Sequence, residues 1–302
     1  MVKPSEAISA ARIFTSIADE LEATQREIEK QLAIIDSAAL HRFDELTHRA
    51  LHHLFRVRGK HLRPSLVLLT ALATGKPNAF QRDVLPRIAA AVELIHSASL
   101  VHDDVIDEAD TRRGQPALNA TDGNKVAVLT GDLLYDQAFA LLTQLTDLGH
   151  QRQIALFELF TTTTRMMCLG EMYEDQIEAD PAVVSFEDYL KVIDYKTASL
   201  MACCCEASCI IMETPDEART RMSGFGHQLG MSYQLIDDVN DHDSVFYNGD
   251  IMVGRAVQEA NLAGEALSHL PTSTYRDRLS EMPAVLLRRA ERVVPAAMYG
   301  ES

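Results

Sequence analysis

Two acidic motifs with the same spacing are the residues in this sequence best suited to chemistry. They are Asp103-Asp104-Val105-Ile106-Asp107 and Asp237-Asp238-Val239-Asn240-Asp241, and each follows an apolar run. In a helix, carboxylates four residues apart lie on one face, where their like charges repel. A hard divalent cation such as Mg²⁺ is the simplest reason for that arrangement. If the two motifs face each other, they would hold several Mg²⁺ ions and bind a diphosphate.

A single motif of this kind also has an ordinary explanation, because a core helix can end in a solvated acidic segment. This sequence contains two copies, and coincidence explains two copies less well than one. We therefore interpret both motifs as candidate metal sites.

Basic residues before the first motif could hold an anion. Gly59 interrupts a helical pattern and Pro64 is suited to open the next helix, with Lys60 and Arg63 between them. Cations near a helix N-terminus add to the backbone N–H groups and the helix dipole, which already favour phosphate. An ordinary basic loop is the alternative interpretation.

Three further residues flank the first motif. Arg112 and Arg113 follow it in a turn marked by Gly114, and arginine is suited to several simultaneous phosphate contacts. His96 precedes Asp103 by two helical turns on the same side. A lone histidine on an apolar helix is more often a core residue, and the residue pattern alone favours that role for His96.

The composition is that of an acidic protein with ample apolar residues. The chain has 302 residues, 47% of them hydrophobic, a net charge of −16 and a pI of about 5.1. An acidic surface argues against nucleic acid or an anionic membrane as the main partner. We see neither a signal pattern nor an apolar run of the ~20 residues that a membrane span needs, and we expect a cytoplasmic protein. The cysteines have neither zinc nor disulfide spacing, and we expect buried, reduced thiols at Cys168, Cys203, Cys204, Cys205 and Cys209.

Apolar residues recur at helical spacing along the chain, and the alternation typical of strands is almost absent. One expected helix has Pro86 near its start and ends at the first acidic motif. The other expected helices cover about 5–35, 38–55, 124–148, 150–178, 186–211, 215–241, 251–269 and 274–294. We predict an all-α fold, a single bundle of long helices in which residues 1–302 form one domain.

Several segments occur together in the order found in one known family. They are Gly59-Lys60 with Arg63-Pro64, Glu93 to Asp107, Arg112-Arg113-Gly114, Gly131-Asp132, Lys196-Thr197, and Gln234 with Asp237-Asp238 and Asp241. In these segments the chain resembles the trans-isoprenyl (polyprenyl) diphosphate synthases of long-chain type, from about residue 55 to 242. The resemblance implies a helical bundle around a central cavity. It also implies an Mg²⁺-dependent prenyltransferase that condenses an allylic diphosphate with isopentenyl diphosphate.

The resemblance also implies a role for each matching residue. Mg²⁺ would be held by Asp103, Asp107 and Asp237, with Asp104, Asp238 and Asp241 as further ligands or supports. The allylic diphosphate would be held by Arg112, Lys196, Thr197 and Gln234. Isopentenyl diphosphate would be held by Lys60, Arg63, His96 and Arg113. The residues expected to matter most for catalysis are Asp103, Asp107, Lys196 and Asp237.

The residues one turn before the first motif bear on product length. Ala98 and Ser99 are small, and bulky aromatic residues at this place in the family close the tunnel floor and give short products. The resemblance therefore implies a long-chain, all-trans polyprenyl diphosphate. The alternative is that Ala98 is only a helix-packing contact and that a deeper residue sets the length.

The chain departs from the family pattern at three places. Arg58 replaces a glycine, Glu174 stands where the family commonly has glutamine, and the segment after Asp241 is shortened. That segment supplies another lysine to the allylic diphosphate in the family. A truncated or non-catalytic homologue that serves as partner subunit of an active synthase is therefore an alternative to a working enzyme.

Further classes of helical protein fit the motifs less well. An acidic helical scaffold leaves both acidic motifs and the basic residues unexplained. A terpene cyclase or a head-to-head condensing enzyme shares the chemistry but does not account for the two basic segments. The family is commonly dimeric, so we expect a homodimer, or a heteromer if the chain is a partner subunit.

Overall fold

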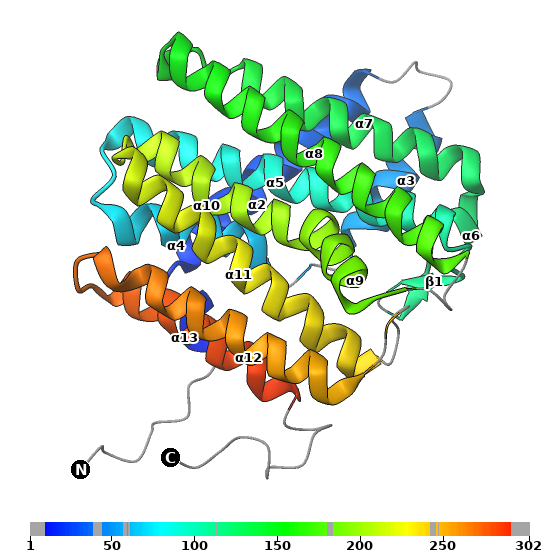
Figure 1. The fold of residues 1–302 in the computed structure, drawn as a ribbon. Helices are drawn as coiled ribbons and strands as arrows, with labels where there is room; N and C mark the ends of the chain where they lie inside the picture. Colours follow the sequence, from blue (N-terminus) through cyan, green and yellow to red (C-terminus); the bar gives the residue numbers. More distant parts are fainter. Residues whose placement is uncertain are drawn as a thin grey trace. The chain divides into compact units, whose positions relative to one another are not determined.

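The computed structural model describes residues 10–38, 44–56, 59, 61–112, 114–179, 184–241, 246 and 248–290. Almost all regular structure among them is helical, which confirms the all-α prediction (Figure 1). Contacts within the chain divide it into two compact units. We call Asp19–Ser65 with Ala79–Phe157 the Asp103 unit, and Met1–Ala18, Leu66–Asn78 and Glu158–Ser302 the Asp237 unit. The single-domain expectation stays a prediction.

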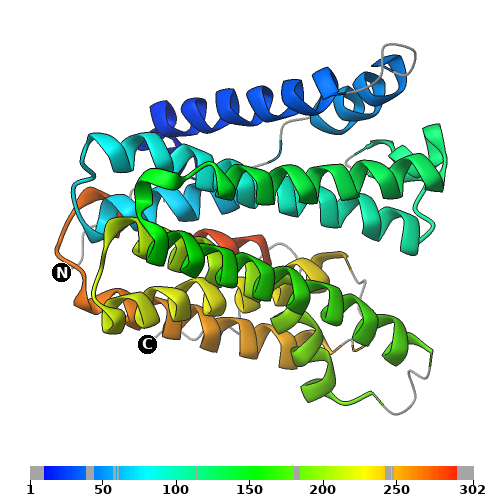
Figure 2. The ribbon, with the colours of Figure 1, turned by 90° about the horizontal axis from the view of Figure 1, so that it is seen from above.

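Two long helices form the centre of the Asp103 unit. α5 (Ala79–Ile106) packs along α7 (Asn124–Thr143) (Figure 2). The remaining elements of this unit are α2 (Ala18–Ala38), α3 (Asp44–Phe55), β1 (Thr111–Arg112), β2 (Gln115–Pro116), α6 (Leu118–Asp122) and η1 (Thr146–Leu148). α4 (Leu62–Thr74) and α8 (His150–Glu178) each have residues in both units.

A glycine explains how closely α7 approaches α5. A Cβ atom on Gly131 would lie 2.2 Å from Nε2 of His102, which no real structure tolerates. The His102 ring therefore occupies the space that a side chain would need, and its Nε2 lies 3.0 Å from the carbonyl oxygen of Val128. The ring immediately before the first acidic motif is thus held against α7.

The Asp237 unit is organised around α11 (Asp216–Asp241), which packs against α10, α12 and α13 (Figure 1). Its elements besides α11 are α1 (Ala10–Thr15), α9 (Phe186–Ile193), the π-helical turn η3 (Asp194–Ala198), α10 (Ser199–Met212), α12 (Gly249–Ala266), η4 (Leu267–His269) and α13 (Thr274–Ala290).

The helix expected over 186–211 is interrupted, and that expectation is wrong at one turn. Ser185 begins α9 with a capping box to Asp188, but residues Asp194–Ala198 form a π-helical turn. Such turns insert an extra residue and occur often at functional sites. Here the inserted turn holds Lys196 and Thr197, two of the residues predicted to bind diphosphate.

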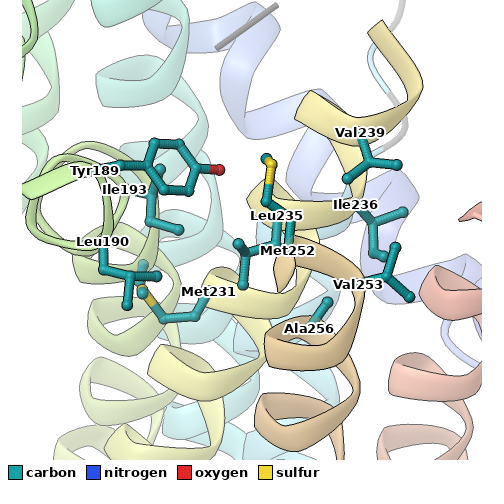
Figure 3. Close-up of a cluster of buried hydrophobic side chains, with 11 residues drawn as sticks. Tyr189, Leu190, Ile193, Met231, Leu235, Ile236, Val239, Met252, Val253 and Ala256 are labelled. Atoms are coloured by element: carbon teal, nitrogen blue, oxygen red, sulfur yellow. The ribbon is translucent and has the colours of Figure 1, made fainter. Parts of the chain in front are cut away.

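Buried apolar side chains hold the end of α11 that carries the second acidic motif. Figure 3 shows Leu235, Ile236 and Val239 of α11 packed with residues of α9 and α12. Full burial of one such side chain contributes about 1.5–3 kcal/mol, so the cluster fixes the motif between three helices. The residues contributed by α9 and α12 include Tyr189, Leu190, Ile193, Met252, Val253 and Ala256.

Other expected helix limits shift modestly. The helix expected over 5–35 is broken into α1 and α2 around Ser16 and Ile17, and α2 extends to Ala38. α3 is described from Asp44, and residues 39–43 of the helix expected over 38–55 lie outside the described residues. Pro86 lies inside α5 rather than near its start. Pro64 is the third residue of α4.

Two described helices, α5 and α7, are long and apolar enough to cross a membrane by length and composition alone. The qualifying window is 67% buried in α5 and 44% buried in α7. Core helices of globular proteins pass the same test, so this is weak support for a span, and the expectation of no span stays a prediction.

The five cysteines are thiols that form no disulfide, and the four from Cys203 to Cys209 are buried. Burial raises the pKa of the Cys203 and Cys205 thiols to about 12. Cys168, on α8, is exposed rather than buried. The prediction of buried, reduced thiols is therefore confirmed for four residues and wrong for Cys168.

Candidate functional site

The first acidic motif lies at the C-terminal end of α5. Asp103 is half-buried, Asp104 is 3% exposed and Asp107 is exposed. The Asp107 backbone N–H donates to the Asp103 carbonyl at 2.8 Å, so the helical turn continues to the end of the motif. Asp103 and Asp107 thus keep the one-turn spacing that the sequence predicted.

The middle carboxylate of this motif is part of the fold. Arg112 Nε donates to Asp104 Oδ1 at 2.5 Å. Burial raises the pKa of Asp104, against the opposing effect of the Arg112 hydrogen bond and charge. Asn119 donates to the backbone carbonyls of Asp104 and Ala109 at 3.0 and 2.9 Å. These contacts anchor the turn after the motif and place Arg112 beside it.

Two of the four residues predicted to bind isopentenyl diphosphate lie together. Arg63 on α4 donates through Nη1 to His96 Nε2 on α5 at 2.9 Å. The arginine side chain has only donors, so this contact makes Nε2 of His96 the acceptor. Arg63 Nε is buried and has no hydrogen-bond partner among the described residues. Lys60 and Arg113, the other two predicted residues, lie outside the described residues, as does Arg58.

The residues predicted to form the tunnel floor lie on α5, the helix that also carries His96 and the first acidic motif. Ala98 is fully buried, and half-buried Ser99 donates to the His96 carbonyl at 2.9 Å. Burial of Ala98 fits a floor and a packing contact equally well, so the floor role stays a prediction. A cavity of about 70 Å³ beside Asp104 and Arg112 has room for a few water molecules, and is too small for a prenyl tail.

The second acidic motif repeats the design of the first. Asp238 is 9% exposed, whereas Asp237 is half-buried and Asp241 is exposed. The Asp238 carboxylate accepts a hydrogen bond at each oxygen, from Tyr189 Oη and from Gln234 Nε2, both at 2.6 Å. The middle carboxylate is again tied into the fold, and the outer two are more accessible.

The pKa of Asp238 is raised to about 7. Burial is the largest cause, and the hydrogen bonds from Tyr189 and Gln234 oppose it. The nearby charges of Glu174 and Asp237 raise it further. Burial therefore favours the uncharged form of the Asp238 carboxyl, and the two hydrogen bonds favour its carboxylate form.

A short chain of hydrogen bonds joins this motif to the π-helical turn. Thr197 Oγ1 donates to Gln234 Oε1 at 2.8 Å, and Gln234 Nε2 in turn donates to Asp238 Oδ1. Gly230 allows α11 to pack closely against the π-helical turn, because a Cβ at this position would lie 2.6 Å from Ala198 Cα. This close packing brings Thr197 within hydrogen-bonding distance of Gln234. Thr197 and Gln234, both predicted to hold the allylic diphosphate, are thus brought together.

The Lys196 side chain points toward α8 and contacts two glutamates of that helix. Its Nζ lies 2.8 Å from Glu171 Oε2 and also hydrogen-bonds Glu174. A Cβ on Gly170 would lie 2.8 Å from the Lys196 backbone nitrogen, so glycine allows this turn to reach α8. Burial raises the pKa of Glu174, against the opposing charge and hydrogen bond of Lys196.

Sequence reasoning missed the partners that position the predicted residues. Tyr189, Glu171 and His102 were not singled out, and Glu174 was noted only as a departure from the family. Each acts across helices that are distant in sequence, so no local spacing pattern marks it. Gly131, Gly170 and Gly230 were a local signal, because a glycine inside a helix often marks the close approach of another element.

The outer carboxylates suit Mg²⁺, which takes oxygen ligands and is usually held by one or two carboxylates together with substrate phosphates and water. Within the described part of the chain, no group of three or more His, Cys, Asp or Glu side chains converges to form a ready metal cage. The two motifs belong to different units, so their meeting at one site stays a prediction.

A family profile described as Polyprenyl synthetase matches residues 44–255, which include both acidic motifs. The chain belongs to this family. A relative from Geobacillus stearothermophilus, named heptaprenyl diphosphate synthase component 2, is 34% identical over 231 residues, or 76% of this chain and 66% of that protein. A Methanosarcina mazei relative named geranylgeranyl diphosphate synthase is 32% identical over 229 residues, or 76% of this chain and 68% of that protein.

A solved structure supports the family fold. A decaprenyl diphosphate synthase from Rhodobacter capsulatus has a TM-score of 0.81 and 23% identity, and the match covers 93% of this chain and 99% of that chain. At this identity the likeness shows the fold alone. The chain spans only 58% to 66% of the lengths of the first curated relatives that it matches.

Proposed function

We propose that the protein is an Mg²⁺-dependent trans-prenyltransferase that condenses an allylic diphosphate with isopentenyl diphosphate into a long-chain polyprenyl diphosphate. Membership of the polyprenyl synthetase family supports the class of reaction. The observation that carries the proposal is the shared design of the two motifs. In each, the middle aspartate is anchored by neighbouring side chains, and the outer two remain more accessible at the end of a long helix.

The hard step is to separate a diphosphate anion from an allylic carbocation. Bound Mg²⁺ supplies positive charge that stabilises the leaving diphosphate. We assign its ligands to Asp103, Asp107, Asp237 and Asp241, and the anchoring of these ligands to Asp104 and Asp238. Arg112, Lys196, Thr197 and Gln234 then hold the allylic diphosphate by charge and hydrogen bonds.

The second substrate has its own cations. We assign the diphosphate of isopentenyl diphosphate to Arg63 and His96, with Lys60 and Arg113. The buried Nε of Arg63, which has no hydrogen-bond partner among the described residues, supports an anion there because buried donors are normally paired. The double bond of isopentenyl diphosphate attacks the allylic carbon, and the departed diphosphate takes the proton that is lost. No side-chain base is required, and an apolar tunnel must keep water from the cation.

The product length follows from the tunnel floor in this proposal. Relatives at similar identity are named for seven-unit and four-unit products, so similarity alone leaves the length open. The small side chains of Ala98 and Ser99 support a long product. Ser99→Phe should shorten the main product in a chromatographic assay, because the half-buried position can accept a ring that closes the floor. An unchanged product length would remove Ser99 from the floor.

A partner chain belongs to the proposal as well. One relative is named as a component of a synthase, which supports a heteromer as an alternative to a homodimer. Val128, Leu129 and Leu133 on α7 are 39%, 53% and 41% exposed, and exposed apolar residues of this kind often mark a protein contact. A non-catalytic partner subunit is the second candidate function on this ground.

We also propose a cytoplasmic location, because cysteines that form no disulfide suit a reducing compartment.

One assay tests the proposed activity. Purified protein is incubated with Mg²⁺, farnesyl diphosphate and labelled isopentenyl diphosphate, and the products are chromatographed. We expect labelled prenyl products, and we expect Asp103→Ala to abolish them. Asp83→Asn is the matched control, because Asp83 lies on the same helix, pairs with Arg87 and is 64% exposed. A protein that forms no labelled product, alone or with a partner synthase, would contradict the proposal.

A further inference from the structure

The side chain predicted to hold the allylic diphosphate already has two anionic partners. Lys196 Nζ lies 2.8 Å from Glu171 Oε2 and hydrogen-bonds Glu174 as well. The three side chains are only 28%, 15% and 28% exposed, respectively. Partial burial weakens solvent screening, so these contacts are stronger than a surface ion pair.

The charges around Lys196 do not balance. Two carboxylates meet one ammonium group, and the charge of Glu178 acts on Glu174 from one turn further along α8. Glu174 also acts on Asp238 of the second acidic motif. An arriving diphosphate therefore meets surplus negative charge and must draw Lys196 away from carboxylates that stabilise it.

The backbone of Lys196 is held in place by close contacts with two helices. The Gly170 contact places its nitrogen against α8, and the Gly230 contact holds Ala198 against α11. Only the long side chain can turn from α8 toward a ligand. The same ammonium group is thus available either to the two glutamates or to a diphosphate.

We propose that Glu174 is a built-in competitor of the diphosphate for Lys196 and that it sets the affinity of this site for the allylic substrate. The inference rests on the proposed function, which makes Lys196 a diphosphate ligand. Glu171 alone balances the charge of Lys196, and Glu174 supplies the surplus. Glutamine at position 174 keeps the shape and the hydrogen-bonding oxygen of the side chain but removes the competing charge.

Calorimetric titration with inorganic pyrophosphate at fixed Mg²⁺ tests the inference without any need for turnover. We expect Glu174→Gln to lower the Kd for pyrophosphate by about fivefold, because one of the two carboxylates that compete for Lys196 loses its charge. Asp175→Asn is the matched control: it removes one charge from the adjacent, exposed position of α8 and should change the Kd by less than about twofold. Lys196→Met should raise the Kd.

The outcomes separate this inference from the proposed function. A Kd that is unchanged or higher in Glu174→Gln, while Lys196→Met still weakens binding, overturns the competitor role and leaves the proposed function standing. Binding that is indifferent to Lys196→Met contradicts the diphosphate role of Lys196 and with it both proposals. If Glu174→Gln fails to fold by circular dichroism, Glu174→Asp serves instead. Its shorter side chain should give a smaller fall in Kd, and no fall would overturn the inference.

Discussion

The carboxylates within each acidic motif have different surroundings. Asp104 and Asp238 are buried and accept hydrogen bonds from Arg112 and from Tyr189 and Gln234, respectively. Their neighbours at the first and last positions of each motif are more accessible. The spacing of the motif therefore gives its aspartates two roles. The first and last aspartates lie on one face of the helix, where they can bind ligands, and the middle aspartate links the helix to neighbouring elements through hydrogen bonds.

This division of roles predicts different defects in two adjacent variants. Asp104→Asn should lower the free energy of unfolding by about 1–3 kcal/mol, because Arg112 loses a charged, buried partner. Asp103→Asn should change stability less, while it lowers kcat by roughly a hundredfold or more, the scale of one lost electrostatic contact with a developing charge. Urea denaturation and steady-state assays measure both quantities. The reverse pattern, a stable Asp104→Asn and an unstable Asp103→Asn, would contradict the roles assigned.

At the scale of elements, the π-helical turn η3 decides where Lys196 and Thr197 point. Three contacts hold the turn: Gly170 of α8, Gly230 of α11, and an ion pair between His227 Nε2 and Asp194 Oδ1 at 2.8 Å. Because these contacts come from two separate helices, displacement of either helix should move the turn. The site is therefore sensitive to packing away from the substrate.

Two glycines of α11 provide a matched test of this packing. Gly230→Ala should lower the free energy of unfolding by about 1–3 kcal/mol, because its Cβ would meet the backbone of Ala198. Gly224→Ala has open space and should stabilise the helix by up to about 1 kcal/mol. Thermal or urea denaturation compares them. Equal effects of the two substitutions would show that the close approach at Gly230 is unimportant.

The ion pair of His227 predicts a pH dependence of stability. The hydrogen bond to Asp194 is the largest cause that raises the pKa of His227 above 6.5, and burial opposes it. The folded protein therefore binds this proton more tightly than the unfolded chain does. The stabilisation is complete below about pH 6.5 and is lost as the pH rises through the folded-state pKa. Denaturation between pH 5 and pH 9, at steps of ~0.5, should show a fall in the wild type that is smaller in His227→Gln. Identical pH profiles would rule out this contribution.

At the scale of the whole molecule, the sequence was most informative where a motif is local and periodic. The acidic motifs, the long helices that carry them and the all-α class follow from helical spacing of apolar residues. The family resemblance assigned Arg63 and His96 to one substrate, and Thr197 and Gln234 to the other. The structure has a hydrogen bond within each pair, and their binding of substrate stays a prediction. The partners that come from distant segments, such as Tyr189 with Asp238, leave no mark on local spacing.

The interruption of the helix at Asp194–Ala198 could not be predicted for a related reason. α10, which follows the turn, is buried on nearly every face, whereas the charged residues Glu187, Asp188 and Lys191 belong to α9 before it. With no polar stripe after the turn to reveal a change of register, one inserted residue does not alter the hydrophobic pattern. The turn is instead set by tertiary contacts with Gly170 and Gly230.

The proposed function requires that both acidic motifs hold one diphosphate through Mg²⁺. The most direct measurement is a crystal structure of the protein with Mg²⁺ and an unreactive thio analogue of farnesyl diphosphate. We expect Mg²⁺ to be held by Asp103 and Asp107 of one motif and by Asp237 of the other, together with the same diphosphate. A diphosphate bound without metal, or metal contacts from only one of the two motifs, would contradict it.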